Sequence, residues 1–132
     1  MRKLNILSIL MVGVIALSSC TSEEQKEIGQ YNKITPEKAR EMMDSESVLI
    51  LDVRTYEEFK ERRIEGALLI PDYEIQKRAE KELPDKDKLI LVYCRSGRRS
   101  ANAAMALINL GYTGIYDFGG INSWPYETES GN

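Results

Sequence analysis

The chain has 132 residues, of which 42% are hydrophobic and 30% charged, and its formal net charge is −3. This length and composition supply one compact core, and the mild acidity argues against nucleic acid as a partner, because no basic field would attract phosphates. The sequence contains no histidine, which excludes Ser-His-Asp triads, Cys-His pairs and imidazole metal sites, and we expect neither a metal nor a cofactor.

Residues 1–19 have the pattern of a lipoprotein signal peptide. Basic residues near the start precede an apolar run over 6–17, which is shorter than the roughly 20 residues that a membrane-spanning helix needs. Residues 17–20, Leu-Ser-Ser-Cys, resemble the bacterial lipobox, in which the cysteine becomes lipidated and forms the new N-terminus. The resemblance implies an extracytoplasmic protein, lipid-anchored through Cys20 to a bacterial membrane on its periplasmic or cell-surface side. The alternative is a short uncleaved membrane anchor.

The folded part is expected over residues 33–127. Residues 20–32 are polar and charged without apolar periodicity, so they predict a lipidated N-terminus followed by a flexible tether, and residues 128–132 predict a polar tail. Once Cys20 carries lipid, the remaining thiol is Cys94, which has no partner for an intramolecular disulfide. A free thiol outside the cytoplasm indicates a chemical role.

From residue 34 onward, strand-like and helix-like segments alternate, which is typical of an α/β domain built on a mainly parallel sheet. Thr35 before a proline predicts a helix start, and the helix is expected to end at about residue 45. The apolar run over residues 48–53 predicts a buried strand. Thr55 and Glu58 then predict a capping box for the next helix.

The second half of the domain continues the same alternation. Residues 68–70 predict a short strand, residues 72–83 a helix and residues 84–87 a turn. Residues 89–93 form the clearest buried strand, and residues 101–108 form an alanine-rich helix that can approach the sheet closely.

The junction between that last strand and helix carries the candidate site. In open α/β sheets, ligands bind beyond the carboxyl ends of strands, where loop amides and the positive end of the next helix converge. Cys94 lies at that point, and nearby arginines and helix amides favour its nucleophilic thiolate without a histidine base. The same amides form a nest for an oxyanion. The residues predicted to bind a substrate anion are Arg95, Ser96, Gly97, Arg98, Arg99 and Ser100.

Two alternatives concern single residues. A cysteine that ends an apolar strand is often an inert core residue, but loop arginines without an anion would be costly to desolvate, which favours a reactive Cys94. Asp52 and Arg54 follow another strand and are candidate supporting residues for the site. A structural ion pair or helix cap is the interpretation we favour for them.

From residue 34 to about residue 124, the chain resembles the single-domain rhodanese family. Residues 52–54 resemble its Asp-x-Arg strand end, residues 66–71 its Gly-Ala-x-x-Ile-Pro segment and residues 93–100 its active loop. The chain departs from the family at residues 62–67, which read Arg-Arg-Ile-Glu-Gly-Ala where the family commonly has Gly-His-Ile-Pro-Gly-Ala.

The resemblance implies a mainly parallel five-stranded sheet with helices on both faces, and sulfurtransferase activity. Cys94 would take sulfane sulfur from a small anion such as thiosulfate, hold it as a persulfide, and pass it to a thiol or redox-protein acceptor. Two alternatives are a cysteine phosphatase or arsenate reductase on the same fold, and a non-catalytic lipoprotein binding module. Cysteine phosphatases hold phosphate with an arginine six positions after the nucleophile, where this chain has Ser100.

Overall fold

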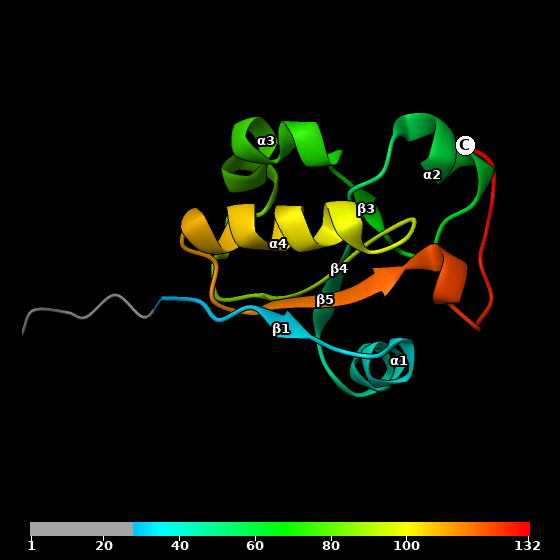
Figure 1. The fold of residues 1–132 in the computed structure, drawn as a ribbon, viewed down its shortest axis with the longest axis horizontal. Coiled ribbons are helices and arrows are strands. Elements are labelled where there is room, and N and C mark those ends of the chain that lie inside the picture. Colours follow the sequence, from blue (N-terminus) through cyan, green and yellow to red (C-terminus); the bar gives the residue numbers. More distant parts are fainter. Residues whose placement is uncertain (1–27) are drawn as a thin grey trace, which may run out of the picture.

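The computed structural model describes residues 28–132, so the predicted signal peptide and the predicted lipidation site at Cys20 lie outside the described residues. A single five-stranded sheet forms the centre of this part, in the order β1-β5-β4-β2-β3 and with every pairing parallel (Figure 1). This confirms the predicted α/β fold. The strands are β1 (Asn32–Lys33), β2 (Val48–Asp52), β3 (Leu68–Leu69), β4 (Leu89–Cys94) and β5 (Ile115–Gly120).

Helices cover both faces of the sheet, as predicted. In Figure 1, α1 lies on one side of the strands, and α3 and α4 lie on the other. Within residues 28–132, none of the helices is long and apolar enough to span a membrane. The helices are α1 (Pro36–Ser45), α2 (Tyr56–Glu61), α3 (Ile75–Glu82) and α4 (Arg98–Asn109), with short 3-10 helices η1 (Asp72–Glu74) and η2 (Ile121–Ser123).

Strand β4 shows how the sheet divides the core into two layers. Its side chains alternate, so Ile90, Val92 and Cys94 belong to the buried cluster on the α3 and α4 side. Leu91 and Tyr93 belong to the cluster that includes α1. Burial on both faces explains why this strand reads as a continuous apolar run. Cys94 therefore lies on the α4 side, at the end of the strand.

Local signals determine where the first two helices begin. Thr35 caps α1 by accepting a hydrogen bond from the Lys38 amide at 3.1 Å, and a proline follows it. In the capping box of α2, Thr55 Oγ1 accepts from the Glu58 amide at 3.3 Å, and the Glu58 carboxylate accepts from the Thr55 amide at 3.0 Å. Both predicted helix starts are confirmed.

Helix α4 begins earlier than its apolar spacing predicts. The alanine-rich pattern indicates a helix over residues 101–108, whereas α4 starts at Arg98, directly after Gly97. Gly97 has a φ of 103°, a left-handed conformation that glycine adopts without steric cost, and this lets the chain turn from β4 into α4 over residues 95–97. The predicted loop after Cys94 is therefore a tight turn followed by the first turn of a helix.

The folded domain begins before residue 33. The prediction of a flexible tether up to residue 32 is wrong at its end, because Asn32 in β1 pairs with Tyr116 of β5, and the Tyr31 hydroxyl donates to Asp117 Oδ2 at 2.7 Å. This pairing covers backbone groups of β5 that would otherwise form an open edge. A strand of two residues has no apolar periodicity, so the sequence pattern does not reveal it.

The C-terminal residues also pack against the domain. The sequence predicts a polar tail over residues 128–132, but Glu129 and Arg63 form an antiparallel bridge with two backbone hydrogen bonds of 2.9 Å. The Gly131 amide donates to the Lys60 carbonyl at 2.9 Å. The tail therefore covers the end of α2, through long-range backbone contacts that leave no local signal in a polar sequence.

Candidate active site

Cys94 is surrounded by the turn that follows β4. Its side chain is buried, with 1% of the residue exposed, and Sγ accepts a hydrogen bond from the Gly97 amide at 3.0 Å. Sγ also lies 3.5 Å from Ser100 Oγ, in the first turn of α4. Sγ therefore lies at the amino end of α4, where helix amides present a partial positive charge. The structure thus places Cys94, Gly97 and Ser100 together, as the sequence predicts.

Strand β5 supplies the opposite wall of this turn. The pairing of β4 with β5 shifts register between Val92 and Cys94, which brings Gly120 opposite Cys94. A side chain on Gly120 would have its Cβ 2.1 Å from the Arg95 carbonyl oxygen, so this position needs a glycine. Ser100 Oγ lies 3.3 Å from the Gly119 carbonyl oxygen, its hydrogen-bond acceptor. This Gly-Gly pair therefore shapes the site.

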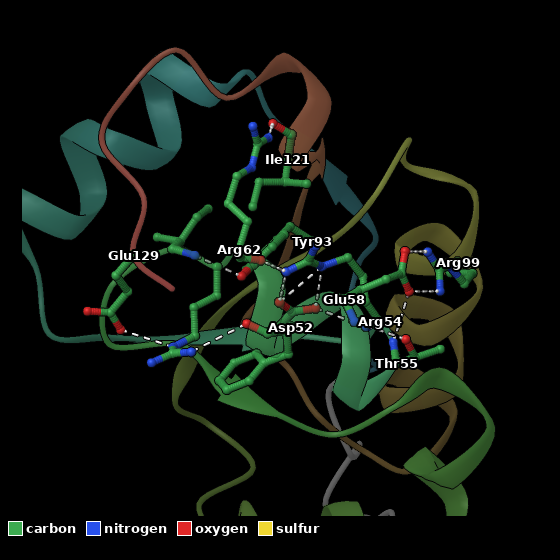
Figure 2. Close-up of polar contacts among 12 residues, drawn as sticks. Asp52, Arg54, Thr55, Glu58, Arg62, Tyr93, Arg99, Ile121 and Glu129 are labelled. Atoms are coloured by element: carbon green, nitrogen blue, oxygen red, sulfur yellow. Dashed lines mark hydrogen bonds and ion pairs between the residues drawn. The ribbon is translucent and has the colours of Figure 1, made fainter. Parts of the chain in front are cut away.

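The arginines of the turn differ in their surroundings. Arg95 and Arg98 are exposed, and no carboxylate pairs with them among residues 28–132. Arg99 instead forms a bidentate ion pair with Glu58 of α2, with distances of 2.7 and 2.8 Å (Figure 2). Hydrogen bonds from Arg99 lower the pKa of Glu58 to about 2. The charge of Arg99 is therefore matched inside the protein, while Arg95 and Arg98 face solvent together with Ser96.

Asp52 and Arg54 form a buried ion pair at the carboxyl end of β2. Arg54 Nη2 lies 2.7 Å from Asp52 Oδ2, and Nε donates to Oδ1 at 3.0 Å, with side-chain exposures of 4% and 0% (Figure 2). Burial lowers the pKa of Arg54, but hydrogen bonds to Asp52 and the charge of Asp52 raise it by more, so the Arg54 guanidinium stays charged. Arg54 Nη2 also donates to the Arg62 carbonyl at 2.5 Å. This geometry is the structural ion pair favoured for these residues.

Tyr93 adds to this buried network from the α1 side of the sheet. Its hydroxyl accepts a hydrogen bond from the Ile64 amide at 3.1 Å. Burial and the neighbouring carboxylate of Asp52 raise the pKa of Tyr93, so its hydroxyl stays neutral. The network fixes the chain between α2 and β3, the segment where this sequence departs from the rhodanese pattern.

Arg62 and Arg63, which lie where the sequence departs from the rhodanese pattern, contact the C-terminal segment. Arg62 Nη2 donates to the Ile121 carbonyl at 2.8 Å, and Arg63 Nε pairs with Glu129 Oε1 at 3.0 Å (Figure 2). The Arg63 guanidinium also lies over the Phe59 ring, 4.7 Å from its centroid. Both arginines therefore bridge segments that are far apart in the sequence.

A cavity of about 210 Å³ opens between α2, the turn after β4 and η2. Its wall is mostly charged, and the sequence analysis did not identify the residues from α2 and η2 that line it. The arginine at position 62, where the family that the sequence resembles commonly has glycine, is a sequence signal that could have indicated the cavity. The lining residues are Arg54, Glu58, Glu61, Arg62, Arg95, Ile121 and Asn122.

The site as a whole combines one nucleophilic sulfur with amide donors and exposed cations. Within the part of the chain that the structure describes, no group of three or more His, Cys, Asp or Glu side chains is placed to hold a metal ion. An amide donor on the sulfur, with exposed cations nearby, suits the binding of an anion that reacts with Cys94.

The chain is similar to proteins of known family. A family model described as Rhodanese-like domain matches residues 35–126. Thiosulfate sulfurtransferase PspE of Escherichia coli is 37% identical over 71 residues, which are 54% of this chain and 68% of that protein. Thiosulfate sulfurtransferase GlpE of Coxiella burnetii is 33% identical over 95 residues, which are 71% of this chain and 87% of that protein.

Solved structures show the same similarity. A structure of an E. coli rhodanese with anions aligns with a TM-score of 0.61 at 32% sequence identity, over 64% of this chain and 100% of that one. The alignment supports the same order of strands and helices around the sheet.

Proposed function

Since this chain belongs to the rhodanese-like domain family, we propose that it is a sulfurtransferase that carries sulfane sulfur as a persulfide on Cys94. The observation that supports this most directly is the hydrogen bond of 3.0 Å from the Gly97 amide to Cys94 Sγ. An amide that already points at the sulfur is suited to stabilise the thiolate before reaction and the persulfide after it. The curated relatives named thiosulfate sulfurtransferase support the same reaction class.

In the first half-reaction, the Cys94 thiolate attacks the outer, sulfane sulfur of thiosulfate. A bond forms between the two sulfurs, the bond from sulfane sulfur to sulfonate sulfur breaks, and sulfite leaves with the electron pair. The products are a Cys94 persulfide anion and sulfite, which balance the charge of the reactants. Exposed Arg95 and Arg98 attract the donor anion, and the amides of the turn hold it.

In the second half-reaction, a nucleophilic acceptor takes the outer sulfur. An acceptor thiolate attacks that sulfur, the bond to Sγ breaks, and Cys94 returns as a thiolate while the acceptor leaves as a persulfide. The Gly97 amide stabilises the leaving thiolate in the same way as it stabilises the starting one. The cycle requires neither histidine nor an external reductant.

The test is intact mass spectrometry of the purified full chain after incubation with thiosulfate, with sulfite assayed in parallel. We expect an adduct about 32 Da heavier on the wild type, lost on addition of cyanide or thiol. The Cys94→Ser variant should show no adduct and release no sulfite. A folded, reduced wild type that forms no adduct with thiosulfate or other sulfane donors would contradict the proposal, and hydrolysis of a phosphate ester by that protein would support the phosphatase alternative.

We also propose that Cys20 is lipidated and anchors the domain to a bacterial membrane. The support is the sequence pattern of residues 1–20, with its apolar run before Leu-Ser-Ser-Cys. Detergent partitioning of the protein produced in bacteria provides the measurement. Wild type should enter the detergent phase with the mass of added acyl chains, and the Cys20→Ala variant should lack that mass. Equal mass and partitioning of the two would contradict lipidation.

A further inference from the structure

We propose that the cavity beside Arg95 binds the carboxylate of a small thiol acceptor, and that Arg62 determines the specificity for it. This inference rests on the proposed sulfur transfer and adds the chemical class of the acceptor. We call this space, lined by α2, Arg62, Arg95 and η2, the acceptor cavity.

The acceptor cavity adjoins the nucleophile through Arg95. This residue follows Cys94 directly in the chain and also lines the cavity, so it links the turn around Sγ to the cavity wall. The volume of about 210 Å³ equals the liquid volume of roughly seven water molecules. That space suits a metabolite of a few heavy atoms and is too small for a folded segment of a partner protein.

The charges on the wall are not all equivalent. Arg54 is matched by Asp52, and Glu58 is matched by Arg99, so neither of these lining residues offers a free charge. Two cations and one carboxylate in the wall have no opposite charge as a partner among residues 28–132. They are Arg62, Arg95 and Glu61.

Arg62 is held in position for an anion. One N–H of its guanidinium donates to the Ile121 carbonyl at 2.8 Å (Figure 2), and both residues line the cavity. A guanidinium has five N–H donors, so most of them stay available. Another part of the wall is also fixed, because the Asn122 amide donates to the Arg95 carbonyl at 3.2 Å. An oriented guanidinium is the group that best recognises a carboxylate.

The carboxylate of Glu61 gives the cavity a preference for a cationic group as well. An acceptor with both a carboxylate and an ammonium group could place the first near Arg62 and Arg95 and the second near Glu61. In the transfer step, the acceptor thiolate attacks the outer sulfur of the Cys94 persulfide, the bond to Sγ breaks, and the acceptor leaves as a persulfide anion. Arg62 takes no part in bond making, so its effect should depend on the acceptor alone.

The kinetic test uses protein already loaded with sulfur on Cys94, so that the donor step is excluded. Discharge rates are measured with L-cysteine, 3-mercaptopropionate, cysteamine and 2-mercaptoethanol. For each acceptor, the rate of the Arg62→Gln variant is divided by the wild-type rate, which cancels differences in thiol reactivity. We expect this ratio to fall roughly fivefold to tenfold below one for the two carboxylates, the scale of one lost hydrogen bond, and to stay near one for the other two.

Two further variants sharpen the result. Glu61→Gln should speed transfer to 3-mercaptopropionate, because the Glu61 charge repels the carboxylate of that acceptor. The same change should slow transfer to cysteamine, because the Glu61 charge attracts its ammonium group. Arg40→Gln is the matched control, since Arg40 lies on α1 and pairs with Asp44 away from the cavity. An equal loss for all four acceptors in Arg62→Gln would overturn the assignment, because it would indicate a structural role.

A binding measurement separates this inference from the proposed function. Backbone amide signals of Arg95 and Asn122 are followed by NMR in Cys94→Ser protein during titration with 3-mercaptopropionate. We expect saturable shifts that Arg62→Gln weakens, even if the wild type forms no persulfide. The absence of saturable shifts would overturn the cavity assignment, whereas a missing sulfur adduct on the wild type would overturn the proposed function and leave the binding of a carboxylate in the cavity standing.

Discussion

Cys94 Sγ is contacted by a backbone amide and a hydroxyl. The guanidinium groups of the turn instead pair with a carboxylate or face solvent. Sγ accepts from the Gly97 amide and lies near Ser100 Oγ, while Arg99 turns to Glu58. The sequence correctly predicts a turn directly after Cys94, because an apolar strand and a glycine follow one another locally. It could not predict that Arg99 is neutralised, because its partner lies 41 residues earlier on α2.

The Arg99–Glu58 pair gives a prediction for pH dependence. The folded-state pKa of Glu58 is lowered from 4.5 to about 2, so the pair stabilises the fold above pH 4.5 and this contribution disappears as pH falls toward about 2. Glu58→Gln should lower the free energy of unfolding at pH 7 by about 1–2 kcal/mol, allowing for partial exposure of the pair. Glutamine keeps the capping box, so the change isolates the ion pair.

Urea denaturation at pH 7 and at pH 3 measures this effect. The difference between wild type and Glu58→Gln should shrink at the lower pH. Glu57→Gln is the control, because Glu57 is exposed on the same helix turn and has no ion pair among the described residues. A difference that is equal at both pH values would mean that the carboxylate charge is not what stabilises this contact.

Among the elements, those with a local signal are predicted well and those made by long-range pairing are not. The α1 cap, the α2 capping box and the apolar run of β4 appear in the sequence because each depends on neighbouring residues. Strand β1 depends on β5, which is distant in the chain, and its two residues show no pattern. The start of α4 is missed because polar residues occupy its first turn, where apolar spacing is uninformative.

The attachment of β1 to β5 can be tested at Tyr31. Its hydroxyl donates to Asp117 Oδ2 at 2.7 Å, and Asp117 Oδ1 accepts from the Gly119 amide at 2.9 Å. Tyr31→Phe should lower the free energy of unfolding by about 1–2 kcal/mol, because a buried carboxylate loses a hydrogen bond. Hydrogen exchange at Gly119 should become faster, since this carboxylate holds its amide.

The pH dependence of the same contact has the opposite sign from that of Glu58. Burial and Asp117 raise the pKa of Tyr31 from 10.0 to about 12, so the stabilisation is complete below pH 10 and is lost as pH rises toward about 12. Tyr73→Phe is the matched control, because Tyr73 is 74% exposed. If Tyr31→Phe and Tyr73→Phe have equal stability at pH 7, the β1 contact does not contribute to folding.

At the scale of the whole molecule, the acceptor cavity is assembled from three distant parts of the chain. The carboxyl ends of parallel strands meet at one edge of the sheet, and this rule predicts that the site lies beyond β4. The rule does not predict which helix or tail completes the wall. Arg95 and Asn122 come together because they follow the paired strands β4 and β5, and Arg62 joins them through its hydrogen bond to the Ile121 carbonyl, a long-range contact without a sequence pattern.

The direction of β1 has a consequence for access to the enzyme. Since β1 runs parallel to β5, the chain enters the sheet at the edge where strands begin, and Cys94 lies at the edge where β4 ends (Figure 1). Under the proposed lipidation of Cys20, the anchored segment therefore joins the domain at the end of the sheet opposite the one that carries Cys94, and the turn around Cys94 is left free of the attachment.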